Sequence, residues 1–391
     1  MASDWLDAEQ VLERLGVRPQ TLYAYVSRGR IEAAVHPHDP RRSLYRASDV
    51  AALAQRKARG RRAADVAAEA IAWGEPVLAS AITTVAGGRL WYRGRDAAAL
   101  AQDHTLEQTA RLLRGGHGAS LKAARAGDVV AGATARARLF NALAARAGVE
   151  APARGRAPLA LAMEAAGLLD AVVDAAAGEV TEGQAHQRLA RAWGVDAAGA
   201  DMLRIALVLL ADHELNASTF AARVAASTGA SLSAAVLAGL CALSGPLHGG
   251  MAARVEAFVA EAERTSPGRA VAARLAQGAA MPGFGHPLYP DGDPRARALL
   301  DAFAPPPLLV DLRRETEGAT GLPPNIDFAL VGMARALSLP ADAPFILFAL
   351  ARTAGWLAHA IEQGQTGRLI RPRARYVGEA LEPGAAGARL A

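Results

Sequence analysis

The chain has 391 residues, of which 52% are hydrophobic and 21% are charged, and this balance excludes an intrinsically disordered protein. Its 43 Lys and Arg residues slightly outnumber its 38 Asp and Glu residues, which permits anionic partners without requiring one. The abundance of alanine, leucine and arginine, all good helix formers, indicates a mainly α-helical fold.

The single cysteine, Cys241, excludes an intramolecular disulfide framework and a cysteine-based zinc finger, and it fits a reducing, cytoplasmic compartment. The first residues do not have the pattern of a signal peptide. No uninterrupted apolar run reaches about 18 residues, so we expect no membrane span.

The first sixty residues are typical of a small separate domain. Asp7 is placed to cap a helix that runs to Leu15 and ends at Gly16, and a second helix is expected after Pro19. Two short β-type runs, 31–35 and 43–45, flank a proline-rich turn and predict a β-hairpin. A further helix through residue 53 then leads into the run 56–62, in which five of seven residues are basic.

The residues LDAEQVLERLGVRPQTLYAYVSRGRI and RRSLYRASDVAAL resemble the winged helix-turn-helix of the MerR and excisionase type. The resemblance implies that the second helix enters the major groove of duplex DNA, to which it would present Arg18, Gln20, Thr21, Tyr23 and Arg28. A helical adaptor with a solvated arginine linker is the alternative. We expect this domain to span 1–62 and a linker helix to span 63–76.

From residue 77 the pattern changes. A β-type stretch at 82–85, the pair Gly87-Gly88 and the residues 90–92 predict a small hairpin. Apolar residues then recur mostly at helical spacing. There is no Walker A loop and no glycine-rich dinucleotide turn after a strand, so nothing supports an ATPase or a dehydrogenase.

Polar residues interrupt the apolar helices at four turns rich in glycine and proline. Each of these residues alone has an ordinary structural explanation, such as a helix cap for an Asp in a turn. Together, three His, one Asp and several Arg are the groups needed to hold a dicarboxylate and to remove a proton from a carbon acid. The segments are ADHELNAST with His213, SGPLHGG with His248, MPGFGHPLYPDGDPRAR with His286 and Arg295, and GLPPNIDFAL with Asp327, followed by Arg352 and Arg371.

In order, type and local spacing these segments resemble citrate synthase, over nearly all of residues 77–378. The resemblance implies an almost all-helical, two-domain homodimer whose site is assembled by domain closure. The large domain would comprise 77–249 and 342–391, and an inserted small domain would comprise 250–341.

The resemblance also implies a reaction: acetyl-CoA, oxaloacetate and water give citrate and CoA, with no metal and no cofactor beyond the acetyl-CoA co-substrate. Asp327 would remove the methyl proton, His248 would stabilise the enolate and His286 would polarise the ketone. The remaining implied oxaloacetate-binding residues are His213, Arg295, Arg352, Phe348 and Arg371, the last acting across the dimer interface. Coenzyme A would lie along the loop 281–289.

Two departures from the family pattern leave the acyl donor open. Met251-Ala252-Ala253 replaces a common Ala-Asn-Glu, and the residues 329–331 lack the Tyr-Ser-Gly often found there. A 2-methylcitrate synthase using propionyl-CoA is therefore an alternative, because one methyl group in a pocket contributes only about 1–3 kcal/mol. A DNA-binding regulator that senses a metabolite with little turnover is a third interpretation.

Overall fold

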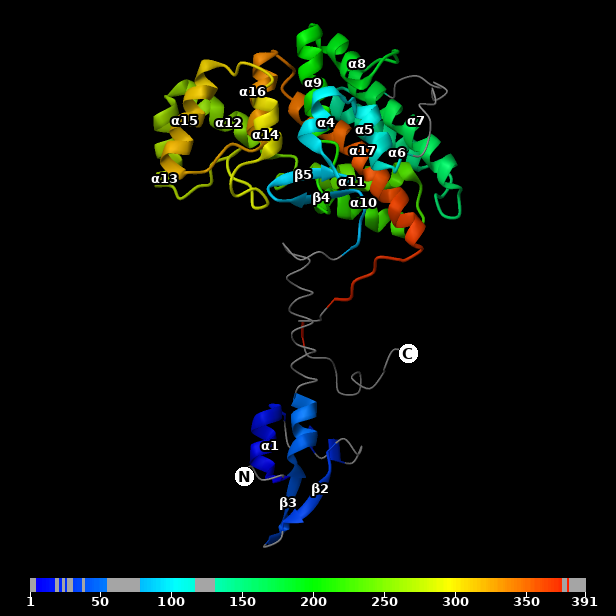
Figure 1. Ribbon diagram of the computed structural model, residues 1–391, viewed down its shortest axis with the longest axis vertical. Helices are drawn as coiled ribbons and strands as arrows, with labels where there is room; N and C mark the ends of the chain where they lie inside the picture. Colours follow the sequence, from blue (N-terminus) through cyan, green and yellow to red (C-terminus); the bar gives the residue numbers. More distant parts are fainter. Residues whose placement is uncertain are drawn as a thin grey trace. The chain divides into compact units, whose positions relative to one another are not determined.

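The computed structural model describes residues 5–17, 21–22, 25–26, 31–36, 39–54, 78–116, 131–374 and 378–379. The chain divides into two compact units, Met1–Ala79 and Ser80–Ala391 (Figure 1). The expected linker helix 63–76 lies outside the described residues.

The N-terminal unit contains the predicted helix and hairpin. Its elements are β1 (Trp5–Leu6), α1 (Ala8–Leu15), β2 (Ala33–His36), β3 (Asp39–Arg46) and helical residues at 21–22, 25–26 and 47–54. Asp7 caps α1 in a reciprocal capping box with Gln10, and Gly16 ends the helix at a φ of 56°, in the left-handed region that favours glycine. The antiparallel sheet has the order β1-β3-β2.

Among the described residues of this unit, the buried side chains are all hydrophobic. Its buried side chains come from both the helices and the sheet, and they form one cluster: Leu6, Val11, Leu15, Leu22, Ile31, Tyr45 and Val50. The amphipathic spacing of α1 therefore places one face of that helix against the hairpin.

The larger unit begins with a three-stranded antiparallel sheet. Strands β4 (Thr83–Ala86) and β5 (Arg89–Tyr92) form the predicted hairpin, in which Gly87 and Gly88 both have positive φ. Such a two-residue turn needs that conformation, which explains the two glycines. A short third strand, β6 (Arg95–Asp96), was not predicted from the sequence.

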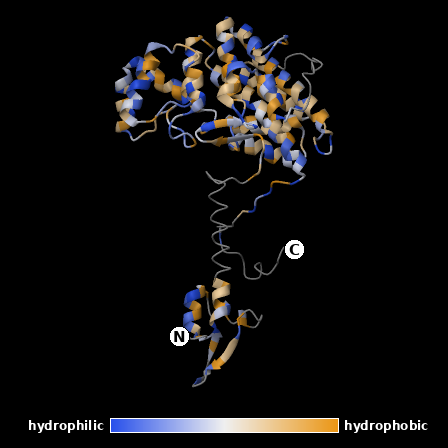
Figure 2. Cartoon of the chain, viewed as in Figure 1, coloured by the Kyte–Doolittle hydropathy of each residue, from blue (hydrophilic) through white to orange (hydrophobic). Residues whose placement is uncertain are grey.

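Helices make up most of the remainder, so the predicted mainly α fold is confirmed. Coloured by hydropathy, the helices carry both apolar and hydrophilic residues along their length (Figure 2), as expected where one face of each is buried. They are α4 (Ala97–Asp103), α5 (Leu106–Leu113), α6 (Ala135–Ala147), α7 (Pro158–Ala177), α8 (Ala185–Trp193), α9 (Ala197–Leu209), α10 (Ala217–Ser227), α11 (Leu232–Leu243), α12 (Met251–Arg264), α13 (Pro267–Ala276), α14 (Pro294–Leu300), α15 (Pro307–Thr320), α16 (Ile326–Ala336) and α17 (Ala343–Thr366).

Helix α17 is the central element of the main core. It packs against α5, α7, α9, α10, α11 and α16. By length and composition alone it is apolar enough to cross a membrane, but that apolar stretch is wholly buried inside the protein. Its Trp356 lies against Gly239 of α11, where a Cβ would come within 2.8 Å of the indole. The apolar composition of α17 therefore reflects a core position.

A second core is formed by α12, α13, α15, the loop before α14 and part of α16. Helix α16 joins the two cores, since Phe328 and Val331 pack in the second core while Ile326 and Leu330 pack in the main core. Figure 1 shows α12, α13 and α15 grouped to one side of α9 and α17, with α14 and α16 between them. The start of α16, at Asp327, therefore lies where the two cores meet.

Candidate active site

The first candidate residue, His213, is buried in the segment between α9 and α10. Its Nε2 lies 2.9 Å from the hydroxyl of Tyr289, which is also buried. The ring of His286 stands edge-on to His213 with a centroid separation of 5.3 Å. The loop of residues 281–293 therefore contacts the segment that carries His213, although more than seventy residues separate them in the chain.

Arg295, in the first turn of α14, is 3% exposed and forms a two-point ion pair with Asp293. Its Nε donates to Asp293 Oδ1 at 3.0 Å and its Nη2 donates to Oδ2 at 2.8 Å. Although burial opposes it, the charge of Asp293 raises the pKa of Arg295. Asp293 Oδ2 also accepts the N–H of Ile326 at 3.1 Å, which links this pair to the start of α16.

Arg352 on α17 is 1% exposed and differs from Arg295 in its partners. Its Nε donates to the carbonyl of Leu210 at 3.1 Å, and its guanidinium lies 4.8 Å from the ring centroid of Phe348. Among the described residues, nothing accepts a hydrogen bond from its buried Nη2. Burial lowers the pKa of Arg352 to about 10, against the opposing charge of Asp212. Arg352 is thus a buried cation whose Nη2 is left to bind an anion.

His248 lies in the turn between α11 and α12 and is partly buried. Its Nε2 is 2.9 Å from Ser218 Oγ, and its ring is edge-on to Phe348 at 6.3 Å. Burial, reinforced by Arg352, lowers the pKa of His248 to about 4. The imidazole is therefore neutral at physiological pH.

His286 is also neutral, and its tautomer follows from its neighbour. Burial, reinforced by Arg295, lowers the pKa of His286 to about 4. The N–H of Leu288 donates to His286 Nδ1 at 3.2 Å, so the ring proton of the neutral form is on Nε2. Burial likewise lowers the pKa of His213 well below its ordinary value, with Arg295 and Arg352 adding to the effect.

Asp327 is in the first turn of α16, but it does not cap the helix. The cap is Asn325, whose Oδ1 accepts the N–H of Asp327 at 3.1 Å. Burial raises the pKa of Asp327 to about 6, although the charges of Arg295 and Arg352 oppose this shift. The carboxylate is therefore more basic than an ordinary Asp and is still mostly ionised at neutral pH.

The structure thus gathers most of the residues expected from the sequence. Ring contacts and mutual electrostatic effects connect His213, His248, His286, Arg295, Asp327, Phe348 and Arg352. Arg371 is not part of this cluster, since it lies in the exposed segment that follows α17. Within the parts of the chain that the structure describes, no group of three or more His, Cys, Asp or Glu side chains could hold a metal ion.

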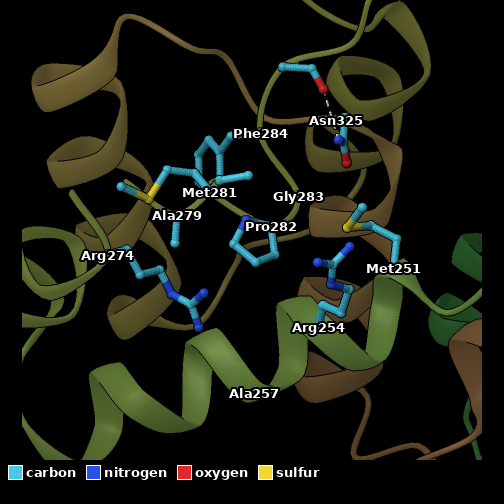
Figure 3. Close-up of a pocket in the computed structure, with 12 residues that line it drawn as sticks. Met251, Arg254, Ala257, Arg274, Ala279, Met281, Pro282, Gly283, Phe284 and Asn325 are labelled. Atoms are coloured by element: carbon cyan, nitrogen blue, oxygen red, sulfur yellow. Dashed lines mark hydrogen bonds between the residues drawn. The ribbon is translucent and has the colours of Figure 1, made fainter. Parts of the chain in front are cut away.

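A pocket of about 430 Å³ is lined by α12, α13, the loop 279–285 and Asn325 (Figure 3). Its lining includes residues close in sequence to His248, His286 and Asp327. At Gly283, with a φ of 83°, a Cβ would come within 2.8 Å of Val255, so the loop needs glycine to pack on α12. The lining residues are Met251, Arg254, Ala257, Arg274, Ala279, Ala280, Met281, Pro282, Gly283, Phe284, Gly285 and Asn325.

A buried polar chain behind His213 was not found by sequence reasoning. His359 Nδ1 is 2.8 Å from Arg223 Nη1, and because arginine can only donate, the ring proton is on Nε2. That Nε2 donates to Asp212 Oδ2 at 3.2 Å. Arg223 also pairs with Glu362 at 2.7 Å, and Glu362 accepts the N–H of Ala81 at 2.9 Å. Tyr289 and Asp293 were missed as well; only the Asp-Pro pair before α14 hints at a helix cap there.

Of the five residues expected to face DNA, the structure describes only one. Thr21 is described, and it is helical and partly buried. The other four residues and the basic run 56–62 lie outside the described residues; the four are Arg18, Gln20, Tyr23 and Arg28.

Residues 161–373 match the family model for the citrate synthase C-terminal domain, and residues 5–58 match one for a helix-turn-helix domain. Citrate synthase 2 of Bacillus subtilis is 39% identical over 189 residues, 44% of this chain and 50% of that protein. The 2-methylcitrate synthase 2 of Corynebacterium glutamicum is 35% identical over 186 residues, 44% of this chain and 48% of that protein. The chain spans about half the length of the curated relatives it matches.

Two solved structures are similar over most of this chain. The crystal structure of citrate synthase from Thermotoga maritima has a TM-score of 0.64 and 26% identity, and it covers 81% of this chain and 98% of that one. The ternary complex of carboxymethyl coenzyme A and oxaloacetate with citrate synthase from Thermoplasma acidophilum has a TM-score of 0.60 and 25% identity, and it covers 79% of this chain and 95% of that one.

Proposed function

Because the chain belongs to the citrate synthase family, we propose that it condenses acetyl-CoA with oxaloacetate and hydrolyses the resulting thioester to citrate and CoA. The observation that carries this proposal is a pair of buried guanidiniums, Arg295 and Arg352, whose charges act on Asp327 and also on the neutral imidazoles. A thioester α-proton is weakly acidic, so its removal by a carboxylate needs a donor for the enolate oxygen and a site that excludes water.

Asp327 is the base in this proposal. It breaks the C–H bond of the acetyl methyl group, takes the proton on its carboxylate and leaves the electron pair in the enolate. Its raised pKa of about 6 supports this role, because general-base catalysis is efficient when the pKa lies near the working pH.

His248 stabilises the enolate oxygen by donating a hydrogen bond. Ser218 Oγ lies 2.7 Å from Asn216 Oδ1 and 2.9 Å from His248 Nε2, so its one hydroxyl proton can serve either acceptor. When that proton turns to Nε2, the neutral imidazole carries its own proton on Nδ1, where it can donate to the enolate.

Oxaloacetate is held and polarised by the remaining residues. His286 donates from Nε2 to the ketone oxygen while the enolate carbon forms the new C–C bond to the ketone carbon. Arg352 binds a carboxylate through its unpartnered Nη2, as supported by its burial and its lack of an acceptor. His213, Arg295 and Phe348 complete the site within one chain, and Arg371 enters from the partner of a homodimer.

Coenzyme A occupies the pocket along the loop 281–289. Arg254 and Arg274 border that pocket and offer positive charge to the phosphate groups (Figure 3). Met251, Met281 and Phe284 offer apolar contacts to the rest of the coenzyme A molecule.

Two further candidates have specific support. The similarity to a 2-methylcitrate synthase and the presence of Met251 in the pocket favour a test of propionyl-CoA. The helix-turn-helix match over 5–58 favours a role in DNA binding, with or without turnover.

Steady-state release of CoA, measured with acetyl-CoA and with propionyl-CoA at saturating oxaloacetate, separates these candidates. We expect the higher kcat/KM with acetyl-CoA. A reversed preference selects the 2-methylcitrate reaction, and binding of oxaloacetate without CoA release from either donor selects the regulator.

A further inference from the structure

Glu214, directly after His213, has an unusual backbone conformation. Among the described residues, only three that are not glycine have a positive φ: Arg93 at 46°, Glu214 at 51° and Ser338 at 52°. The left-handed region is sterically unfavourable for a residue with a Cβ, and it persists only where the surroundings hold it. Some contact must therefore hold Glu214 in this strained conformation next to His213.

The cause lies in the sheet at the start of the larger unit. Glu214 Oε1 accepts the backbone N–H of Val85, in strand β4, at 2.5 Å. Strand β5 makes a second attachment, because the hydroxyl of Tyr92 lies 3.1 Å from the carbonyl of Leu209 and 3.2 Å from that of Asp212. The hairpin therefore fixes the segment 209–214 at both of its ends.

This segment positions two of the proposed site histidines. It carries His213, whose carbonyl accepts the side-chain N–H of Asn216 at 3.0 Å. Asn216 in turn caps α10 through the N–H groups of Ser218 and Thr219. Ser218 Oγ is the group that contacts His248. A shift at residue 214 is thus passed to both imidazoles through hydrogen bonds given by the structure.

We propose that Glu214 is a positioning residue, which holds the segment 213–218 in its active arrangement by accepting the Val85 N–H. This inference rests on the proposed function and assigns Glu214 no contact with substrate. It also gives a role in the site to a hairpin that precedes the matched residues 161–373.

Three substitutions separate the acceptor, the charge and the backbone strain. Glu214→Gln keeps an acceptor and removes the charge, so we expect kcat/KM for oxaloacetate within about threefold of the unsubstituted chain. Glu214→Ala removes the acceptor and keeps the strain, and we expect a loss of about tenfold or more. Glu214→Gly removes the acceptor and relieves the strain, so it should recover thermal stability but not kcat/KM.

The donor side is tested with Val85→Pro, which removes the N–H in an edge strand where proline is tolerated. If one hydrogen bond is responsible, Glu214→Ala and Val85→Pro together should cost little more than either alone. Ser338→Ala is the matched control, because Ser338 has the same backbone conformation in the turn between α16 and α17. It keeps the same strained backbone and should leave kcat/KM unchanged.

Hydrogen exchange of the peptides covering 208–218 gives a readout independent of turnover. Faster exchange there in Glu214→Ala and Val85→Pro, but not in Glu214→Gln or Ser338→Ala, supports the proposal. Unchanged exchange, unchanged kcat/KM in Glu214→Ala, or a Glu214→Gln variant as impaired as Glu214→Ala overturns it. If the unsubstituted chain neither releases CoA nor binds oxaloacetate, the proposed function is refuted instead. The exchange comparison then still shows whether the hydrogen bond from Val85 to Glu214 holds the segment 213–218 in place.

Discussion

The two compact units of this chain place their charged residues in opposite ways. The described part of the N-terminal unit buries only hydrophobic side chains, and an ion pair between Arg46 and Glu32 is about half exposed. The larger unit buries Arg295 and Arg352 almost completely. A dicarboxylate is small enough to be enclosed by such buried charges, whereas duplex DNA must be met at a surface. Buried charges are screened much less by salt than exposed ones, so the two proposed activities should respond differently to salt.

Asp327→Asn should have the largest effect. We expect kcat to fall by about a thousandfold or more while oxaloacetate still binds, because only a role in the transition state is removed. Since burial raises the pKa of Asp327, its ionised form is disfavoured in the folded state, and the Asn variant should melt at a higher temperature at pH 8.

Steady-state kinetics, calorimetric binding of oxaloacetate and thermal melting check this prediction. Asp291→Asn is the control, because Asp291 is exposed on the same loop as His286. A kcat in Asp327→Asn close to that of the unsubstituted chain contradicts the assignment.

Arg371 tests whether each site needs two chains. Arg371→Ala and Asp327→Ala should each be nearly inactive. Random mixing makes about half of the dimers mixed, and in these one of two sites has both residues intact, so about a quarter of all sites should recover. Co-expression with two affinity tags measures this recovery. Confirmed mixed dimers that stay as inactive as their parents show that Arg371 does not act on the partner.

Arg352→Gln removes the buried guanidinium whose Nη2 has no acceptor among the described residues. We expect kcat/KM for oxaloacetate to fall about a hundredfold, and Arg352→Lys should not restore it, because an ammonium cannot reproduce the guanidinium geometry. Arg368→Gln, in the exposed segment after α17, is the control. A Lys variant with full activity implies that charge alone matters at this position.

The salt dependence of DNA binding tests the activity proposed for the N-terminal unit. With the full chain, replacing Arg59, Arg61 and Arg62 by Ala should flatten the slope of log K against log salt by about three, if each contacts one phosphate. The same triple variant should keep its CoA-releasing activity. If the full chain shows no salt-sensitive binding to any duplex DNA fragment, the adaptor interpretation is favoured.

The pH profile should show the smallest effect. Asp327 must be ionised to act, so kcat/KM should fall as the pH drops through about 6, rather than through about 4 as for an ordinary Asp. Measurement of kcat/KM from pH 5 to 8 locates this limb. A kcat/KM that does not fall between pH 7 and pH 5 shows that the carboxylate is not desolvated in the working enzyme.

Local sequence patterns predicted many of the helices and hairpins, but they did not predict contacts between residues that are far apart in the sequence. Gly87-Gly88 identified the first hairpin of the larger unit, and Asp7 and Gly16 identified the ends of α1, because turns and caps depend on neighbouring residues. Of the nearby partners, the ion pair of Arg295 with Asp293 was missed, because the Asp-Pro pair before α14 indicates only a helix cap.

The contacts that position the candidate site join residues that are far apart in the sequence. Tyr289 meets His213 from 76 residues away, and Glu214 meets Val85 from 129 residues away. Periodicity and propensity carry no information about such pairs. Family resemblance located the site segments because their order and spacing match, but it did not indicate what holds them in place.

The attachment of Ala81 to Glu362 has a consequence for how this chain can be rearranged. Arg223 of α10 pairs with Glu362, and Ser227, one helical turn further along α10, accepts the N–H of Ile370 at 3.1 Å. Ala81 and Ile370, one near each end of the larger unit, are therefore attached to α17 and α10, which the Arg223–Glu362 pair holds together. Units whose ends lie close together tolerate circular permutation and fusion, so this unit is suited to carry an appended module at either end without disturbing its core.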